Sequence, residues 1–137
     1  MFLLIQLKRL EKNISVTSEN TTFATAYKVP EQVNTVLSNS CYDCHSNNTK
    51  YPWYSEVQPM ASLMEEHIVD GKEKLNFDEL SSYGPRRTKS KFKQIINQIQ
   101  QNKMPLDSYT LMHKNTALSK EEQQLLVDYF NSLIQLQ

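Results

Sequence analysis

The sequence predicts an all-α domain, and three observations carry that prediction. Apolar residues recur at intervals of three and four along several stretches, which is the spacing of one helix face. Ser119 and Glu122 form a capping box that marks the start of a further helix. No segment shows an alternating strand pattern of comparable strength. The 137 residues suit one domain with a single buried core.

The N-terminal residues are interpreted as an arm. The apolar run from Phe2 to Leu7 is far shorter than the roughly 20 residues of a membrane span, and the charges after it are in the wrong order for a signal peptide. It is either the start of a short amphipathic segment or the remnant of a longer membrane anchor. Residues 13–30 are polar without periodicity, so we expect little structure there. The chain is therefore divided into an arm, 1–28, and a domain, 29–137.

Two helices are expected in the first half of the domain. The first follows Pro30, and its apolar face, which begins at Val33, also carries Cys41 and Cys44. The second has Pro59 in its first turn and Gly71 as its stop, with Met60, Leu63, Met64, His67 and Ile68 on one stripe. Between them lies a polar loop that ends in aromatic residues.

Three further helices are expected toward the C-terminus. A short one starts at Asn76, where Glu79 completes a possible capping box, and ends near Gly84 and Pro85. Another runs over about 86–101, with Phe92, Ile95, Ile96 and Ile99 on its buried stripe. Residues 104–113 are expected to be a loop. The last helix follows Ser119.

Composition excludes several classes of protein. Fifteen basic residues balance fifteen acidic ones, so charge gives no reason to expect a nucleic-acid partner. An apolar fraction of 39% describes a soluble chain that folds. The two cysteines are the only ones in the chain, which excludes a scaffold of several disulfides. A cofactor or a redox pair is the better explanation for them.

Cys41, Cys44 and His45 form a Cys-x-x-Cys-His motif, which is typical of covalent haem attachment. The two thiols form thioether bonds, and the imidazole binds the iron. A thioredoxin-like redox pair would be expected in a βαβ context, which is missing. A zinc site would have to recruit His45, His67 or His113 at spacings that match no common zinc module. Haem is therefore the favoured ligand.

The chain also resembles a known family over roughly residues 29 to 134. The residues that carry the resemblance are Cys41-Tyr-Asp-Cys44-His45-Ser-Asn-Asn, Tyr51-Pro52-Trp53-Tyr54, Gln58-Pro59, Gly71-Lys72, Asn76-Phe77, Met104-Pro105-Leu106, Tyr109-Thr110 and His113. They are similar to the bacterial haem-binding domain family, which is related to the monohaem c-type cytochromes. The resemblance implies a class I cytochrome c-like helical fold around one covalently attached haem c. It also implies a periplasmic or exported protein, commonly with a membrane anchor.

The same resemblance suggests the second iron ligand. In monohaem cytochromes this ligand is usually a methionine before the last helix, often followed by proline, and Met104-Pro105 occupies that position. His113 is the main alternative, followed by Met112 or Met60, and an iron without a second protein ligand is also considered. The other N–H of His45 needs an acceptor, which we expect in the loop from Ser46 to Pro59. Trp53, Tyr54 and Tyr109, together with Tyr51, either line the haem edge or belong to the core.

The first functional hypothesis is one-electron transfer by a monomer with His45 and Met104 on the iron. Its partner would be an unidentified redox protein, and the basic residues 86–93 are either a solvated face or a docking patch for it. An enzyme is the less favoured reading: a peroxidase-like activity would need an open iron and an acid–base residue such as His113. A haem sensor, or a haem domain that serves another enzyme, is the third hypothesis.

Overall fold

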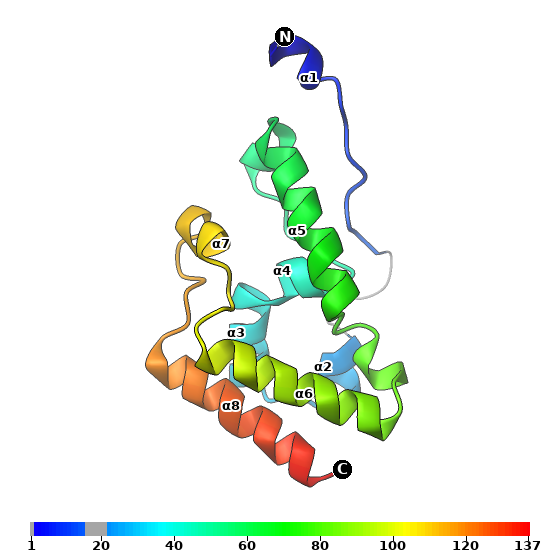
Figure 1. Cartoon of the computed structure of the whole chain (residues 1–137), viewed down its shortest axis with the longest axis vertical. Helices are drawn as coiled ribbons and strands as arrows, with labels where there is room; N and C mark the ends of the chain where they lie inside the picture. Colours follow the sequence, from blue (N-terminus) through cyan, green and yellow to red (C-terminus); the bar gives the residue numbers. More distant parts are fainter. Residues whose placement is uncertain (1, 16–21) are drawn as a thin grey trace.

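The computed structural model describes residues 2–15 and 22–137, and it is built from helices (Figure 1). Within these residues the only β-type pairing is an isolated bridge between Ile14 and Asn48. The prediction of an all-α fold is confirmed. The elements are α1 (Phe2–Ile5), α2 (Thr22–Ala26), α3 (Glu31–Ser40), α4 (Tyr42–His45), η1 (Trp53–Glu56), α5 (Met60–Lys74), η2 (Leu80–Ser82), α6 (Pro85–Gln100), α7 (Asp107–Met112) and α8 (Lys120–Gln135), where η denotes a 3₁₀ helix.

Helices α6 and α8 pack side by side and form the base of the molecule (Figure 1). Phe92 of α6 and Phe130 of α8 are fully buried, with their ring centroids 5.5 Å apart. The predicted capping box of α8 is present: the Ser119 hydroxyl accepts from the Glu122 N–H, and the Glu122 carboxylate accepts from the Ser119 N–H. Pro85 occupies the first turn of α6, where its missing N–H costs no helical hydrogen bond.

Residues 13–30 were expected to carry little structure, and this expectation is wrong for the part that the structure describes. Helix α2 lies within them, and its Phe23 is fully buried against the rings of Phe77, Phe92 and Phe130. A helix of five residues is too short to show a periodic pattern, so only tertiary packing reveals it. The expectation for residues 16–21 lies outside the described residues.

The first predicted helix is interrupted at the haem motif. Helix α3 ends at Ser40, Cys41 has φ −129° and ψ −46°, and α4 begins at Tyr42. The prediction that both cysteines lie on one continuous helix face is therefore wrong. The break changes the direction of the chain between the two thiols.

Helix α5 continues past the glycine that was predicted to stop it. Gly71 lies inside the helix, which ends at Lys74. A Cβ atom on Gly71 would lie 2.6 Å from the carbonyl oxygen of Cys44. The glycine is thus needed for the close approach of α5 to α4, and it has no role in ending the helix.

Two other local predictions also need correction. Asn76 begins a turn, in which its side chain accepts from the Asp78 N–H, and the helix that follows is only the short η2. The segment 104–113 was expected to be a loop, but it contains α7, which begins at Asp107. Both elements are short, with three residues in η2 and six in α7, so they show little periodicity in the sequence.

The N-terminal arm is bonded to the rest of the molecule through Asn13. The amide of Asn13 donates to the Ser46 carbonyl and the Thr49 hydroxyl, and its oxygen accepts from the Lys72 ammonium. Tyr51 accepts a hydrogen bond from the Asn13 N–H at 2.6 Å. The arm therefore braces the loop that follows the Cys-x-x-Cys-His motif. Among the described helices, none has the length and apolar character that crossing a membrane requires.

Candidate functional site

His45 is held in one orientation by the end of α5. Its Nδ1 lies 2.9 Å from the carbonyl oxygens of both Gly71 and Leu75. Carbonyls only accept hydrogen bonds, so Nδ1 carries the proton and Nε2 keeps its lone pair. The acceptor was expected in the loop from Ser46 to Pro59. That prediction is wrong, because the contact between Gly71 and Cys44 brings the end of α5 to the imidazole instead.

The surroundings of His45 keep its imidazole neutral. Burial lowers the pKa of His45, and the nearby Lys74 ammonium lowers it further, although the two carbonyls raise it. A neutral imidazole with one free nitrogen is the form that binds a metal ion. The site therefore presents a nitrogen donor whose direction is set before any ligand arrives.

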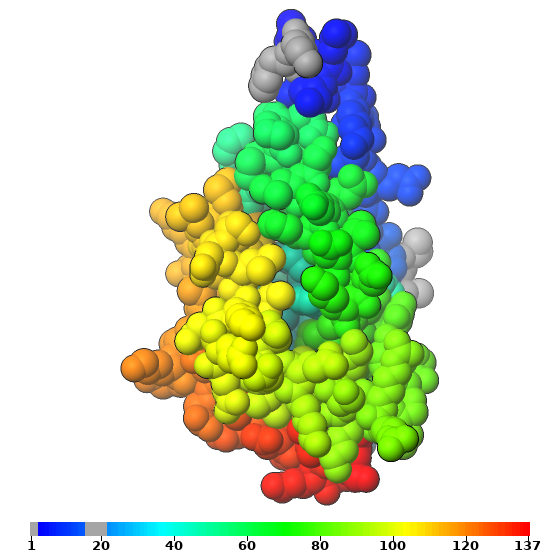
Figure 2. Space-filling model, in the orientation of Figure 1, coloured from blue at the N-terminus to red at the C-terminus, as the bar shows by residue number. Residues whose placement is uncertain are grey.

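A cavity of about 460 Å³ lies beside this imidazole. Cys41 and His45 line it from the motif, and Met104 lines it from the connection between α6 and α7. Its volume falls in the usual range for cofactor sites. Figure 2 shows the surface hollowed between α5 and the yellow segment that follows α6, with atoms from the region of α3 and α4 visible at the base. The remaining lining residues are Lys74, Leu75, Phe77, Lys91, Gln94, Ile95, Gln98, Ile99, Pro105 and Leu118.

Cys44 lines a different and smaller cavity, of about 40 Å³, between α5 and α7. The alternative iron ligands Met60, Met112 and His113 all lie around this second cavity. Met104 thus lines the same cavity as His45, whereas the alternatives line the cavity beside Cys44. The other residues around Cys44 are Tyr54, Leu63, Met64, His67, Ser108 and Tyr109.

The predicted aromatic residues occupy different positions. Tyr54 and Tyr109 lie near Cys44, whereas Tyr51 lines a separate cavity under the N-terminal arm. Trp53 is 81% exposed and, within the described residues, lines none of these cavities. It is the first residue of η1, and it contacts the Tyr54 ring at the surface. The structure does not bring Trp53 to the site.

A hydrogen-bonded chain connects α7 to the motif. The Tyr109 hydroxyl donates to the Asp43 carboxylate at 2.8 Å, and Asp43 stands between the two cysteines. The Tyr109 ring stacks on His113, whose Nδ1–H donates to the Tyr109 carbonyl. The other nitrogen of His113, Nε2, accepts from the Tyr54 hydroxyl at 2.7 Å. Both nitrogens of His113 are therefore engaged, and α7 is fixed beside Cys44.

Both cysteines are free thiols, and both are partly buried. Burial raises the pKa of Cys41 to about 12 and that of Cys44 to about 11. Redox-active pairs usually have lowered pKa values, so the environment does not resemble that of a thioredoxin-like centre. Within the described residues, no group of three or more His, Cys, Asp and Glu side chains is arranged to hold a metal ion.

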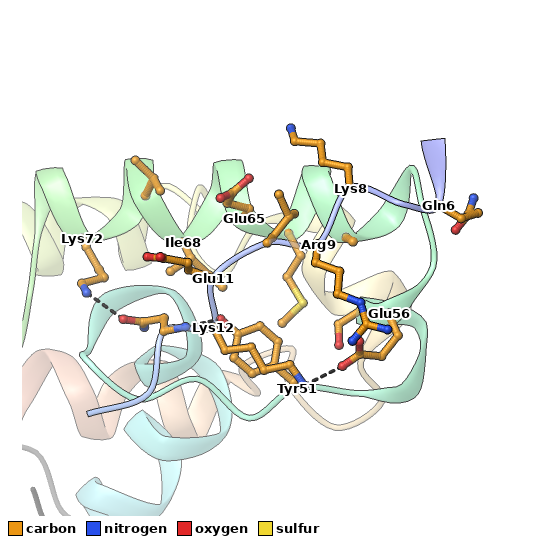
Figure 3. A pocket seen from close by; sticks show the side chains of 16 residues that line it. Gln6, Lys8, Arg9, Glu11, Lys12, Tyr51, Glu56, Glu65, Ile68 and Lys72 are labelled. Carbon is orange, nitrogen blue, oxygen red and sulfur yellow. Dashed lines mark hydrogen bonds and ion pairs between the residues drawn. The ribbon is translucent and has the colours of Figure 1, made fainter. Parts of the chain in front are cut away.

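A larger cavity, of about 920 Å³, lies between the arm and α5 (Figure 3). Its lining mixes cations such as Arg9 and Lys72 with the acids Glu11, Glu56 and Glu65. None of the predicted cysteine, histidine or Met104 ligands lines it. The chemistry of the motif therefore belongs to the smaller cavities.

Sequence reasoning missed the polar side of the His45 cavity, which is formed by Lys74, Lys91, Gln94 and Gln98. The spacing of three of these residues in the sequence could have revealed them. Lys91, Gln94 and Gln98 are spaced as one helix face and lie next to the apolar stripe of α6. The position of Lys74 could not be predicted from the sequence, because only the approach of α5 to α4 places this side chain at the cavity.

The fold and the site define a helical cofactor-binding domain that presents nitrogen and sulfur donors to an apolar cavity. The model of the haem-binding domain family matches residues 1–132, and the chain belongs to that family. Comparisons with curated proteins and with solved structures gave no match. The family establishes haem as the ligand class. The residues fit this ligand, because the imidazole is preset, Met104 is available as a thioether, and the cavity walls are largely aliphatic and aromatic.

Proposed function

We propose that this protein is a monohaem c-type cytochrome that transfers single electrons. One haem c would be attached through Cys41 and Cys44, and His45 Nε2 and Met104 Sδ would bind its iron. When bound, the haem supplies an iron centre that gains or loses one electron. The protein would act on no substrate of its own, and its partner would be another redox protein.

One observation carries the proposal: His45 and Met104 line the same cavity, whereas Met60, Met112 and His113 line another. His113 is further disfavoured, because Tyr54 and Tyr109 already engage both of its ring nitrogens. Of the ligand pairs considered, His45 and Met104 are the pair that lines a common cavity.

The side chains of the cavity suit reversible electron transfer. The Gly71 and Leu75 carbonyls keep the His45 ring in place, so ligand geometry changes little between oxidation states. Met104 provides a soft, neutral sulfur donor that favours the ferrous state. Ile95, Ile99 and other apolar neighbours line the cavity.

The decisive experiment is an optical spectrum of the exported protein in the ferric and ferrous states. We expect a low-spin spectrum with the weak red charge-transfer band of thioether–iron ligation, and we expect Met104→Ala to abolish that band. Met112→Leu is the matched control and should leave the band unchanged. A high-spin wild-type spectrum with ready uptake of carbon monoxide would contradict electron transfer and favour a sensor or a peroxidase-like function.

We also propose that the protein is exported and that its N-terminal segment tethers it to a membrane. Leu3, Leu4 and Leu7 are 80%, 71% and 76% exposed, and basic Lys8 and Arg9 follow them. We expect the full chain to float with anionic phospholipid vesicles, and a Leu3→Ser, Leu4→Ser, Leu7→Ser variant to remain unbound. Equal flotation of both proteins would contradict the tether.

A further inference from the structure

The charged side chains that line the His45 cavity are all cationic. Apart from Cys41 and His45, its side chains with hydrogen-bonding groups are Lys74, Lys91, Gln94 and Gln98, and neither an aspartate nor a glutamate lines it. The cavity under the arm differs, because glutamates accompany its cations. The His45 cavity is therefore suited to a ligand that is apolar over most of its surface and carries anionic groups.

The two lysines reach the cavity from different helices. Lys74 belongs to the last turn of α5 and Lys91 to α6, and the Lys91 ammonium donates to the Lys74 carbonyl. This bond brings the Lys91 ammonium to the end of α5. An ammonium has three N–H donors, so two remain for another acceptor. Neither lysine forms an ion pair among the described residues.

The glutamines extend the cationic region along α6. Lys91, Gln94 and Gln98 are three and four residues apart, so they lie on one face of the helix. Ile95 and Ile99 follow the two glutamines and supply the apolar part of the same cavity. The cavity therefore has an apolar side and a side of hydrogen-bond donors.

We propose that Lys74 and Lys91, assisted by Gln94 and Gln98, bind the carboxylates of the cofactor and so set its orientation in the cavity. This inference rests on the proposed function, because it takes haem as the occupant of the cavity. The two propionates of haem are the only charged groups at its periphery. Ammonium–carboxylate bonds would direct that edge toward the junction of α5 and α6. These lysines are positioning residues and do not bind the iron.

The test compares two ligands that differ only in their carboxylates. A full-length chain with Cys41→Ala and Cys44→Ala keeps His45 and binds without covalent capture. Its dissociation constants are measured for ferric haem and for ferric haem dimethyl ester, in which both carboxylates are neutral. The same measurements are made after Lys74→Gln and Lys91→Gln, singly and together. Lys93→Gln is the matched control, because Lys93 is exposed on α6 and does not line the cavity.

We expect haem to bind more tightly than the ester. Each lysine substitution should weaken haem binding by about 2- to 5-fold, as for a partly exposed ion pair, and should leave ester binding unchanged. Lys93→Gln should change neither constant. Equal affinities for haem and ester, or equal losses for Lys91→Gln and Lys93→Gln, would overturn the inference and leave the proposed function standing. If neither ligand binds, the proposed haem cavity fails, and the inference fails with it.

The holoprotein provides a second measurement. Removal of a cation beside the haem stabilises the ferric form, so Lys74→Gln and Lys91→Gln should each lower the reduction potential of the exported protein. The Lys93→Gln potential should match that of the wild type at physiological ionic strength. A wild-type potential in both cavity variants would contradict the placement of the two ammonium groups.

Discussion

At the scale of single residues, the orientation of His45 depends on a very close approach of two backbones. Gly71 faces the Cys44 carbonyl, and its own carbonyl accepts from the His45 Nδ1–H. One residue thus sets both the spacing between α4 and α5 and the direction of the imidazole. Any larger side chain at this position would affect both.

Gly71→Ala should destabilise the protein by about 1–3 kcal/mol, because the new methyl group would overlap the Cys44 carbonyl. Gly84→Ala is the matched control, since a Cβ there meets no atom within 4 Å. Urea unfolding monitored by circular dichroism measures both. Equal losses would show that the contact with Cys44 is not the cause.

Two tyrosine hydroxyls provide a second test at this scale. The Tyr129 hydroxyl is buried and, among the described residues, has no hydrogen-bond partner, whereas the Tyr42 hydroxyl donates to Asn34 at 2.9 Å. Tyr129→Phe should leave stability unchanged or raise it by up to about 1 kcal/mol, and Tyr42→Phe should lower it by about 0.5–1.5 kcal/mol. Thermal unfolding under identical conditions compares them. The reverse order would contradict the assigned hydrogen bonds.

At the scale of elements, the shortest helices have a large influence on the fold. Helix α2 places Phe23 in the centre of the aromatic core, and α7 closes the Cys44 cavity through Tyr109. Neither element is long enough to be stable alone, so both form only against the longer helices. Their stability is therefore a property of the packed domain.

Phe23→Ala should lower the free energy of unfolding by about 3–5 kcal/mol, because it leaves a cavity among Phe77, Phe92 and Phe130. Thr25→Ala lies on the same helix but is exposed, and it should cost less than about 0.5 kcal/mol. The two variants are compared by their denaturant midpoints, provided that their m-values are equal. A small effect of Phe23→Ala would mean that α2 is not part of the cooperative core.

At the scale of the whole molecule, the site lies against one side of the core, and Phe77 and Ile99 belong to both. The base of α6 and α8, with α2 and α3, holds most of the buried residues. Above it, α5 and the segment that follows α6 face each other across the hollow seen in Figure 2. The His45 cavity is lined by the end of α5, by α6 and by the segment around Met104, so a ligand in it would join these three parts.

Removal of haem should therefore loosen the upper region and spare the base. Protein made without haem attachment should keep its helical far-ultraviolet spectrum, while amides of α7 and of the segment around Met104 exchange faster than in the holoprotein. Amides in the centre of α8 serve as the internal control and should remain protected in both forms. Uniform protection in both forms would contradict a structural role for the ligand.

The sequence allowed the long elements to be predicted, and the reason is periodicity. The stripe from Phe92 to Ile99 and the capping box at Ser119 indicated α6 and α8 correctly. The short helices α2 and α7 were not predicted, because five or six residues contain less than two helical turns. The acceptors of the His45 Nδ1–H hydrogen bond were also not predicted, since Gly71 and Leu75 are 26 and 30 residues away along the chain.

By itself, the sequence determined the helical class and the ligand type. Cys41, Cys44 and His45 lie within five consecutive residues, so local spacing alone was enough to indicate covalent haem attachment. Only the tertiary structure decided which side chains share a cavity with His45. It separated Met104 from Met112 and His113, although all three lie within ten residues of one another. The physical reason is that ligand geometry depends on distances between elements, and packing sets those distances.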